Sequence, residues 1–300
     1  MKRLQKWVML GCLLSSHAFA EPLTISSWNI EWLSTNVAVN KFSAQRDQAD
    51  FDKLEQYFRS LDADVVAFQE VDDINAIQRI AGDQYEILMS DRALPENSNR
   101  QFQEVNQYTG FAVRKGIALT EYADFPLETS ANSKLRFASY IVVETDTDTD
   151  TDTDTKPIHM LSVHLKAGCS GAYKSNRDCS RLKDQAQQLN KWIQQRERKG
   201  EDYAILGDFN HNLSYSRDWM WKDMAQNTDA QLATRKTLAD CKVRSNRNNH
   251  RTHQFRSVID HIVVSKSLDA SPAKQKVFET QDVLDYKLSD HCPVSTTLKQ

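Results

Sequence analysis

Six short clusters of polar residues occur along the 300-residue chain, each beside a run of apolar residues. They contain carboxylate, amide and imidazole side chains: Asn29 and Glu31, Glu70, His164, Asp208 and Asn210, Asp260, and Asp290 and His291. A turn or a helix cap explains any one of them, because Asp and Asn often bond to the nearby backbone. Six independent turns do not explain the whole set, and we expect these side chains to converge on one ligand.

The side chains in these clusters are suited to metal-assisted hydrolysis of a phosphate ester. The carboxylates and amides offer hard oxygen ligands, which suit Mg²⁺ or Mn²⁺ better than a structural zinc. His164 and His291 can donate to phosphate oxygens or move protons near neutral pH. The sequence lacks a CxxC pair, a Gly-rich phosphate loop and a G-x-S-x-G motif. Structural zinc, Walker-type nucleotide chemistry and serine hydrolysis are therefore disfavoured.

The apolar runs beside the clusters have the lengths and spacing of strands and helices. Strands are predicted over residues 23–30, 64–68, 110–113, 137–143, 158–165, 203–206, 258–264 and 293–298. Helical spacing predicts helices over 51–61, 74–80 and 182–193, and Gly200 is a stop for the last of these. Strands outnumber helices and several are consecutive, which predicts a mixed sheet or two packed sheets flanked by helices.

The first twenty residues have the pattern of a secretory signal peptide. Three basic residues accompany an apolar run over 7–14, and Ala18-Phe19-Ala20 forms a cleavage site. The run is too short to span a bilayer, and no later segment is long and apolar enough to do so. We therefore predict a signal peptide over 1–20, a single domain over 21–300, a secreted or periplasmic location and no stable membrane insertion.

Four cysteines remain after the predicted cleavage, and an even number in an oxidising compartment indicates a disulfide framework. Four cysteines allow three pairings. We predict Cys169–Cys179, which would close a short loop. The second pair, Cys241–Cys292, would tie the segment before Asp260 to the chain beside His291.

Residues 145–155 alternate threonine and aspartate and form a low-complexity segment. Because this segment lies between two predicted strands, we expect it to be the exposed tip of a hairpin. Alternating aspartates also offer weak ligands for calcium. A solvated loop without a catalytic role is the simpler interpretation.

The ordered set WNIE, QE, HLK, GDFN, IDH and SDH resembles the endonuclease/exonuclease/phosphatase superfamily, which includes pancreatic-type deoxyribonuclease and exonuclease III. The resemblance runs from Trp28 to Pro293, and the segment from Cys169 to Cys179 is similar to an exported bacterial branch. It implies an α/β fold: a four-layer sandwich of two packed mixed β-sheets with helices outside. It also implies a hydrolase of phosphodiesters that depends on Mg²⁺ or Mn²⁺.

The resemblance also implies a metal site and a phosphate donor. Glu70 resembles the principal metal ligand of the family, and Asn29 resembles an amide near the metal and the phosphate. Glu31 stands where some members have a second acidic ligand. His164 resembles a donor to the phosphate oxygens.

The remaining positions resemble the groups that handle water and protons. Asp208 and Asn210 resemble the pair that positions the attacking water and stabilises the transition state. Asp260 resembles the carboxylate that orients a catalytic histidine. His291, beside Asp290, resembles the general base or a phosphate ligand, and either Asp260 or Asp290 is its acidic partner.

Nucleic acid is the substrate that the basic residues favour. The formal net charge of −3 excludes binding through bulk positive charge, so a local basic surface is required. Two groups could line a groove that tracks a phosphate backbone: Arg244, Arg247, Arg251 and Arg256, and Lys166, Lys174, Arg177 and Arg181. The leading hypothesis is an exported nuclease that cleaves DNA, and by extension RNA, as a monomer without a protein partner.

Three alternatives stay open. A sphingomyelinase-like lipid phosphodiesterase shares the fold but needs an exposed apolar hairpin to enter a bilayer. Trp219 and Trp221 offer a membrane-binding or base-stacking surface, unless they pack beneath the GDFN loop. A small phosphomonoesterase is the second alternative. The third, a binding module without activity, predicts losses at catalytic positions, and the sequence has none.

Overall fold

The computed structural model describes residues 22–36, 41–128, 133–144 and 156–299. The predicted signal peptide and the Thr-Asp repeat lie outside these residues. Among the described helices, none is both long and apolar enough to cross a membrane.

Two sheets form the centre of the protein, and both mix parallel and antiparallel pairs. The first has the order β13 (Asp269–Ala270), β15 (Val294–Lys299), β1 (Leu23–Leu33), β2 (Val65–Val71), β4 (Tyr108–Arg114) and β3 (Tyr85–Met89), and β14 (Lys274–Gln275) also pairs with β15. The second has the order β5 (Leu119–Phe125), β6 (Ala138–Val143), β7 (Ile158–His164), β8 (Asp202–Asp208), β12 (Asp260–Val264) and β9 (Gln231–Leu232). The parallel pairs are β1 with β2 and β7 with β8.

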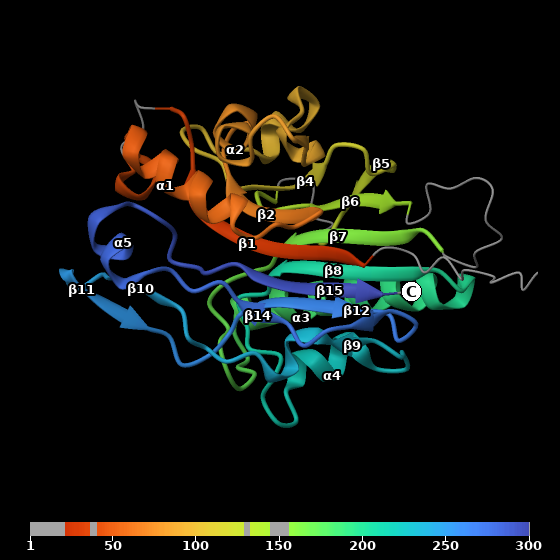
Figure 1. Ribbon diagram of the computed structural model, residues 1–300. Helices are drawn as coiled ribbons and strands as arrows, with labels where there is room; N and C mark the ends of the chain where they lie inside the picture. The colour runs from red at the N-terminus through yellow and green to blue at the C-terminus, as the bar shows by residue number, and fades with distance from the viewer. Residues whose placement is uncertain (1–21, 37–40, 129–132, 145–155, 300) are drawn as a thin grey trace, which may run out of the picture.

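The sheets pack face to face, and helices cover both outer faces (Figure 1). Apolar side chains from both sheets fill the space between them, among them Ile25, Val65, Phe111, Met160, Leu206 and Ile262. The helices α1 (Gln48–Arg59) and α2 (Ile74–Ala81) pack on the first sheet. The helices α3 (Arg177–Lys199) and α4 (Trp219–Ala225) pack on the second. The predicted four-layer sandwich of two mixed sheets is confirmed.

Local signals in the sequence explain where the long helices begin and end. Asp47 caps α1 and forms a reciprocal pair of hydrogen bonds with Asp50, so two otherwise free N–H groups are satisfied. Asn176 caps α3, and Gly200 ends it with a φ of 68°, as its position in the sequence predicts. The apolar stripe of α3, which includes Leu182 and Ile193, is fully buried against the second sheet.

Sequence periodicity missed several strands, among them the partly buried β3 and the more exposed β5. Most of β5 faces solvent, so it has no alternation of apolar and polar residues. β10 (Lys242–Ser245) and β11 (Asn248–Gln254) form a separate ribbon whose second strand is entirely polar. Backbone pairing with β10 places His250 and His253 in β11.

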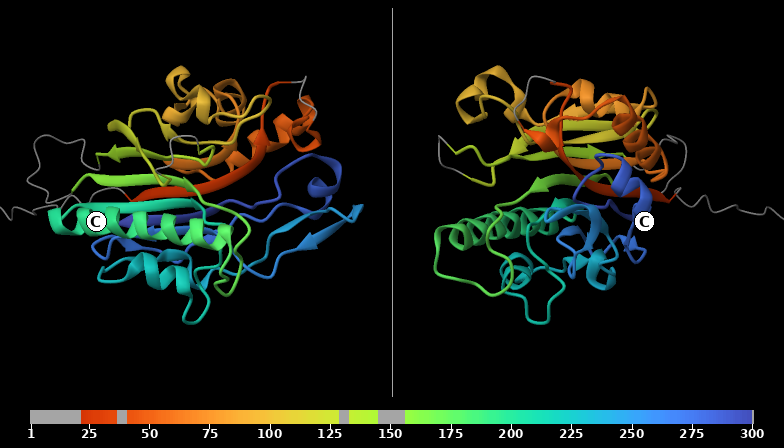
Figure 2. Two further views of the ribbon diagram at one scale, coloured as in Figure 1. Left: turned by 180° about the vertical axis from the view of Figure 1, so that it is seen from behind. Right: turned by 90° about the vertical axis from the view of Figure 1, so that its left-hand side faces the viewer.

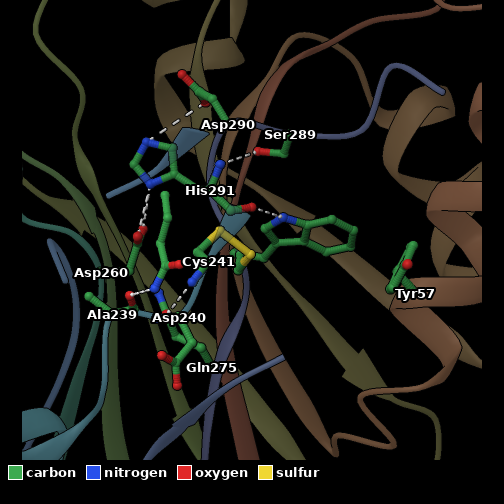
Figure 3. The surroundings of a disulfide bond; sticks show 12 residues. Tyr57, Ala239, Asp240, Cys241, Asp260, Gln275, Ser289, Asp290 and His291 are labelled. Atoms are coloured by element: carbon green, nitrogen blue, oxygen red, sulfur yellow. Dashed lines mark hydrogen bonds and ion pairs between the residues drawn. A yellow bond between two sulfur atoms is a disulfide. The ribbon is translucent and has the colours of Figure 1, made fainter. Parts of the chain in front are cut away.

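Both predicted disulfides are present. Cys169 and Cys179 join the loop after β7 to the start of α3, with a Cα–Cα distance of 4.9 Å. Cys241 and Cys292 join the start of the β10–β11 ribbon to the residue after His291, with a Cα–Cα distance of 5.7 Å (Figure 3). The two bonds suggest an oxidising, extracytoplasmic compartment.

Candidate active site

All nine predicted site residues lie at one edge of the sandwich. The strands β1, β2, β7 and β8 end at this edge, whereas β12 and β15 begin there. Strand register accounts for part of the convergence: Asp208 is the register partner of His164 on one side and of Asp260 on the other. Figure 2 shows the same edge from the side, with the β10–β11 ribbon and α5 (Thr280–Asp285) beside it.

The backbone is irregular at three of the site residues, and this irregularity sets the direction of their side chains. The pairing of β1 with β2 shifts register between Asn29 and Leu33, and that of β2 with β4 shifts between Phe68 and Val71. Within these shifts Glu31 and Glu70 have φ angles of 44° and 58°. Asn210, in the loop after β8, has a φ of 52°. Positive φ is costly for residues other than glycine, and such strain is typical of functional sites.

His291 is held by its backbone and oriented by one carboxylate. Its Nδ1 lies 2.8 Å from an oxygen of Asp260, whereas its Nε2 is 3.8 Å from Asp290, beyond hydrogen-bond distance (Figure 3). Its backbone N–H donates to Ser289, and its carbonyl accepts from the indole of Trp28. Asp260 is therefore the hydrogen-bonded partner, and the Nε2 side of the ring faces the site.

Charge around His291 favours its protonated form. Burial disfavours the imidazolium, but the carboxylates of Asp260 and Asp208 outweigh it and hold the pKa of His291 well above its ordinary value. Burial also raises the pKa of Asp208 to about 7, although the His291 cation opposes this. Oδ2 of Asp208 and Nε2 of His291 lie 3.8 Å apart, so the two groups share their titration.

Two amides fix the central carboxylate. The side chain of Asn29 donates to Oδ2 of Asp208 at 3.0 Å, while its own oxygen accepts from the backbone of Glu31 at 3.1 Å. The backbone N–H of Asn210 donates to Oδ1 of Asp208 at 2.7 Å, and the Asn210 side chain donates to Leu165. Asn29 thus links the two sheets at the site and positions both Glu31 and Asp208.

Arg136 belongs to the site although the sequence analysis missed it. Its Nη2 lies 2.9 Å from Nε2 of His164 and 2.8 Å from Oε1 of Gln107. A guanidinium only donates, so Nε2 of His164 accepts and the imidazole proton lies on Nδ1. Burial first, and then Arg136, lower the pKa of His164 well below its ordinary value, so this ring is neutral. The only signal for Arg136 in the sequence is a basic residue just before the apolar run 137–143.

The sequence profile of the Endonuclease/Exonuclease/phosphatase family matches residues 26–291. The chain belongs to this family. Membership makes it a hydrolase of the phosphoesterase class, in which enzymes generally depend on a divalent metal. A search among curated proteins found no significant match.

Solved structures share the fold at low sequence identity. An endonuclease/exonuclease/phosphatase family protein from Bacteroides thetaiotaomicron has a TM-score of 0.63 at 14% identity and covers 93% of this chain and 98% of that chain. A mannosyl-6-phosphatase from the same organism has a TM-score of 0.61 at 14% identity, covering 92% and 99%. TDP2 from Caenorhabditis elegans has a TM-score of 0.59 at 13% identity, covering 96% and 78%. These neighbours support the fold alone.

The side chains at this edge of the sandwich offer donor atoms that fit a hard divalent cation. Asp208, Asp260 and His291 offer ligand atoms that lie within 4.8 Å of one another. Beside them, Oε2 of Glu31 accepts from the backbone of Asp290 at 3.0 Å. Burial, together with the charges of Asp290 and Glu70, raises the pKa of Glu31 to about 7, although Arg46 opposes this. His291 carries a proton and is therefore not counted as a ligand, so the fit rests on the crowded carboxylates, which a cation stabilises. Oxygen ligands suit Mg²⁺ or Mn²⁺.

We expect divalent metal to stabilise the protein more at pH 8 than at pH 6. Glu31 and Asp208, both with a pKa of about 7, retain protons at pH 6 that a cation must displace. Their raised pKa also lowers the stability of the metal-free protein as pH rises from their unfolded values towards 7. Melting temperatures measured with and without Mn²⁺ at pH 6, 7 and 8 test this. A metal-induced shift that does not vary with pH would contradict it, and Glu31→Gln should flatten the variation.

A cavity of about 620 Å³ opens beside the site. Glu31, Ser289 and Asp290 form one wall, and residues 244–249 of the β10–β11 ribbon form another. Arg244 and Arg247 of the first predicted basic group are among these lining residues. In the second basic group, Lys166 pairs with Asp178 at 3.0 Å, so part of its charge is already neutralised. Two arginines of the first predicted basic group therefore line a cavity beside the site.

Proposed function

We propose that this protein is an exported, divalent-metal-dependent phosphodiesterase whose substrate is nucleic acid, DNA in the first place. The observation that carries the proposal is the continuity of the carboxylate and histidine edge with the cavity beneath the ribbon. Arginine and asparagine side chains line the ribbon side of that cavity, at residues 244 and 246–249. Guanidinium and amide groups are the donors that bind phosphate and sugar oxygens in nucleic-acid complexes.

The ribbon is fixed in place beside the site. Nη2 of Arg244 donates to the carbonyls of Leu284, in α5, and of Tyr286, just after it, and Cys241 is bonded to Cys292. Between residues 241 and 259 the chain has no acidic residue. A phosphate chain that leaves the site over the ribbon would therefore meet arginines and no carboxylate from the ribbon itself.

Different residues of the site would hold the cation and activate the attacking water. Glu70 and Glu31 would hold the cation, which when bound supplies positive charge to the phosphate. Asp208, fixed by Asn29 and Asn210, positions the attacking water, whose proton passes to the Asp208–His291 pair.

Charge that develops on the phosphate needs donors that are already in place. Asn210 and Arg136 are suitable donors at this edge, and His164 acts by holding the Arg136 guanidinium. Since Nε2 of His164 is an acceptor, this assignment moves the phosphate contact predicted for His164 to Arg136.

The described surfaces fit the lipid alternative poorly. The ribbon beside the site is polar and basic, with the sequence NNHRTHQ in β11, whereas a bilayer-entering hairpin needs apolar side chains. Trp219 and Trp221 pack against the core beneath the second sheet, and the indole of Trp219 donates to Gly171. Both tryptophans are therefore partly buried against the core, which favours a structural role over a membrane-binding one.

A substrate panel tests the proposal. The purified protein is assayed on supercoiled plasmid, linear DNA, RNA, sphingomyelin, inositol phosphates and mannose 6-phosphate, each with Mg²⁺, Mn²⁺ or chelator. We expect cleavage of plasmid that chelation abolishes. Turnover of sphingomyelin or of a phosphomonoester with intact plasmid would reject the nuclease assignment, and activity that survives chelation would reject the metal as well. Protein recovered outside the cytoplasm should begin at Glu21 if the export prediction is correct.

Arg136→Met should lower the turnover of plasmid by about 10²-fold, the usual scale for loss of one oxyanion donor. The variant also leaves Nε2 of His164 and Oε1 of Gln107 without their donor, so a lower melting temperature is expected. Arg136→Lys restores the charge and one hydrogen bond and should recover part of the turnover. Equal activity of Arg136→Met and the wild type, per folded molecule, would remove Arg136 from the site.

A further inference from the structure

A second cavity, of about 410 Å³, lies on the other side of Glu31 from the ribbon. Its lining combines two aromatic rings with two lysines and one glutamate: Trp32, Phe102, Lys41, Lys134 and Glu104, together with Gln103 and Val105. We call it the Trp32–Phe102 pocket. In Figures 1 and 2 the segment between β3 and β4, which contains Phe102, lies above β1, and the β10–β11 ribbon lies below it.

Two residues that line the Trp32–Phe102 pocket are close in sequence to residues of the active site. Trp32 follows Glu31 in the irregular part of β1 and has a φ of 54°. On the opposite wall, Val105 is two residues from Gln107, whose side chain binds Arg136. A substrate group attached to the cleaved phosphate could therefore reach this pocket from the site.

Hydrogen bonds hold the loop that carries the aromatic ring of Phe102 in place. The side chain of Asn106 accepts from the backbone N–H of Phe102 at 2.8 Å and donates to its carbonyl at 3.2 Å. The backbone N–H of Asn106 is itself bound by Asp72, and Arg92 donates to the Asn106 oxygen. These bonds fix the loop that carries Phe102, although the ring itself is 39% exposed.

The lysines of the pocket rest on rings rather than on carboxylates. The ammonium of Lys41 lies 3.3 Å from the ring centroid of Trp32, and that of Lys134 lies 5.4 Å from the ring centroid of Phe102. Among the described residues, neither lysine has a carboxylate within ion-pair distance. Both charges are therefore available to an anionic ligand.

We infer that the Trp32–Phe102 pocket is a nucleobase-binding subsite, which rests on the proposed nuclease function. A base stacks on an exposed ring in place of the lysine ammonium, and the ammonium pairs with a flanking phosphate. Two lysines against one glutamate give the lining a net positive charge, which repels a choline head group and attracts a nucleotide. With the ribbon cavity on the other side of Glu31, the substrate chain extends in both directions from the cleaved bond.

Kinetics on matched substrates test the subsite. The wild type, Phe102→Ala and Lys134→Gln are compared on a DNA oligonucleotide and on an abasic oligonucleotide of the same length. Phe102→Ala removes a stacking partner, so it should raise the KM for the base-containing substrate about tenfold and leave the abasic substrate unchanged. Lys134→Gln removes a phosphate contact and should raise the KM for both substrates. Tyr122→Ala is the matched control, because Tyr122 is 47% exposed on β5, at the far edge of the second sheet.

A binding measurement separates failure of the subsite from failure of the nuclease assignment. In the presence of chelator, quenching of a 2-aminopurine dinucleotide by the wild type but not by Phe102→Ala would support the subsite even if no nucleic acid is cleaved. Cleavage of DNA with the same KM in the wild type and Phe102→Ala would overturn the subsite and leave the nuclease assignment standing. Equal losses of Phe102→Ala on base-containing and abasic substrates would also overturn it, since stacking would not be involved.

Discussion

His291→Ala is expected to lower turnover on DNA by about 10²–10⁴-fold, the usual contribution of an imidazole in proton transfer. The backbone anchors of this residue do not involve its side chain, because Ser289 and Trp28 bind its N–H and carbonyl. The disulfide of Cys292 holds the same segment. We therefore expect the variant to fold, and turnover and melting temperature should be measured on the same sample.

The matched control is His159→Ala, because His159 lies at the end of β7 that is far from the site. His159 bonds to Tyr140 and Arg196 through its Nδ1 and lies far from the site along the strand. Its loss should lower the melting temperature and leave turnover per folded molecule unchanged. If His291→Ala instead behaves as His159→Ala does, the ring of His291 is a structural anchor and has no part in catalysis.

Glu70→Gln is expected to reduce activity strongly and to raise the metal concentration needed for half-maximal activity. The glutamine keeps the size and hydrogen-bonding shape of the side chain but removes the negative charge that holds a hard cation. Glu70 lies in the irregular part of β2 with its carboxylate 3.7 Å from Nε2 of His164, so the change falls at the centre of the edge. Activity is titrated with Mn²⁺, and binding of Mn²⁺ is followed directly by calorimetry.

Glu86→Gln makes the same chemical change at an exposed position of β3. It should leave the metal titration as in the wild type. Reduced activity of Glu70→Gln with unchanged binding of Mn²⁺ would show that Glu70 acts on the substrate and does not hold the metal. A normal metal requirement with normal turnover would remove Glu70 from the site altogether.

Local patterns in the sequence determined the layers of this protein. The buried strands β2 and β8 contain apolar runs over residues 65–68 and 203–206, and α3 has both its apolar stripe and its stop at Gly200. Periodicity and end signals are encoded within a few residues, so they are visible without the fold. The polar clusters after these runs likewise predicted which residues meet at the edge, and the spacing of the cysteines predicted both disulfides.

Only the tertiary structure decided how the site residues face one another. The register shifts that turn Glu31 and Glu70 depend on pairing between distant strands, and nothing in either strand alone specifies them. The choice of Asp260 over Asp290 as the partner of His291 follows from the position of β12 beside β8. Arg136 and the β10–β11 ribbon are polar segments without periodicity, so only their long-range partners place them at the site. These contacts join residues far apart in the chain, and their geometry is fixed by packing rather than by local preference.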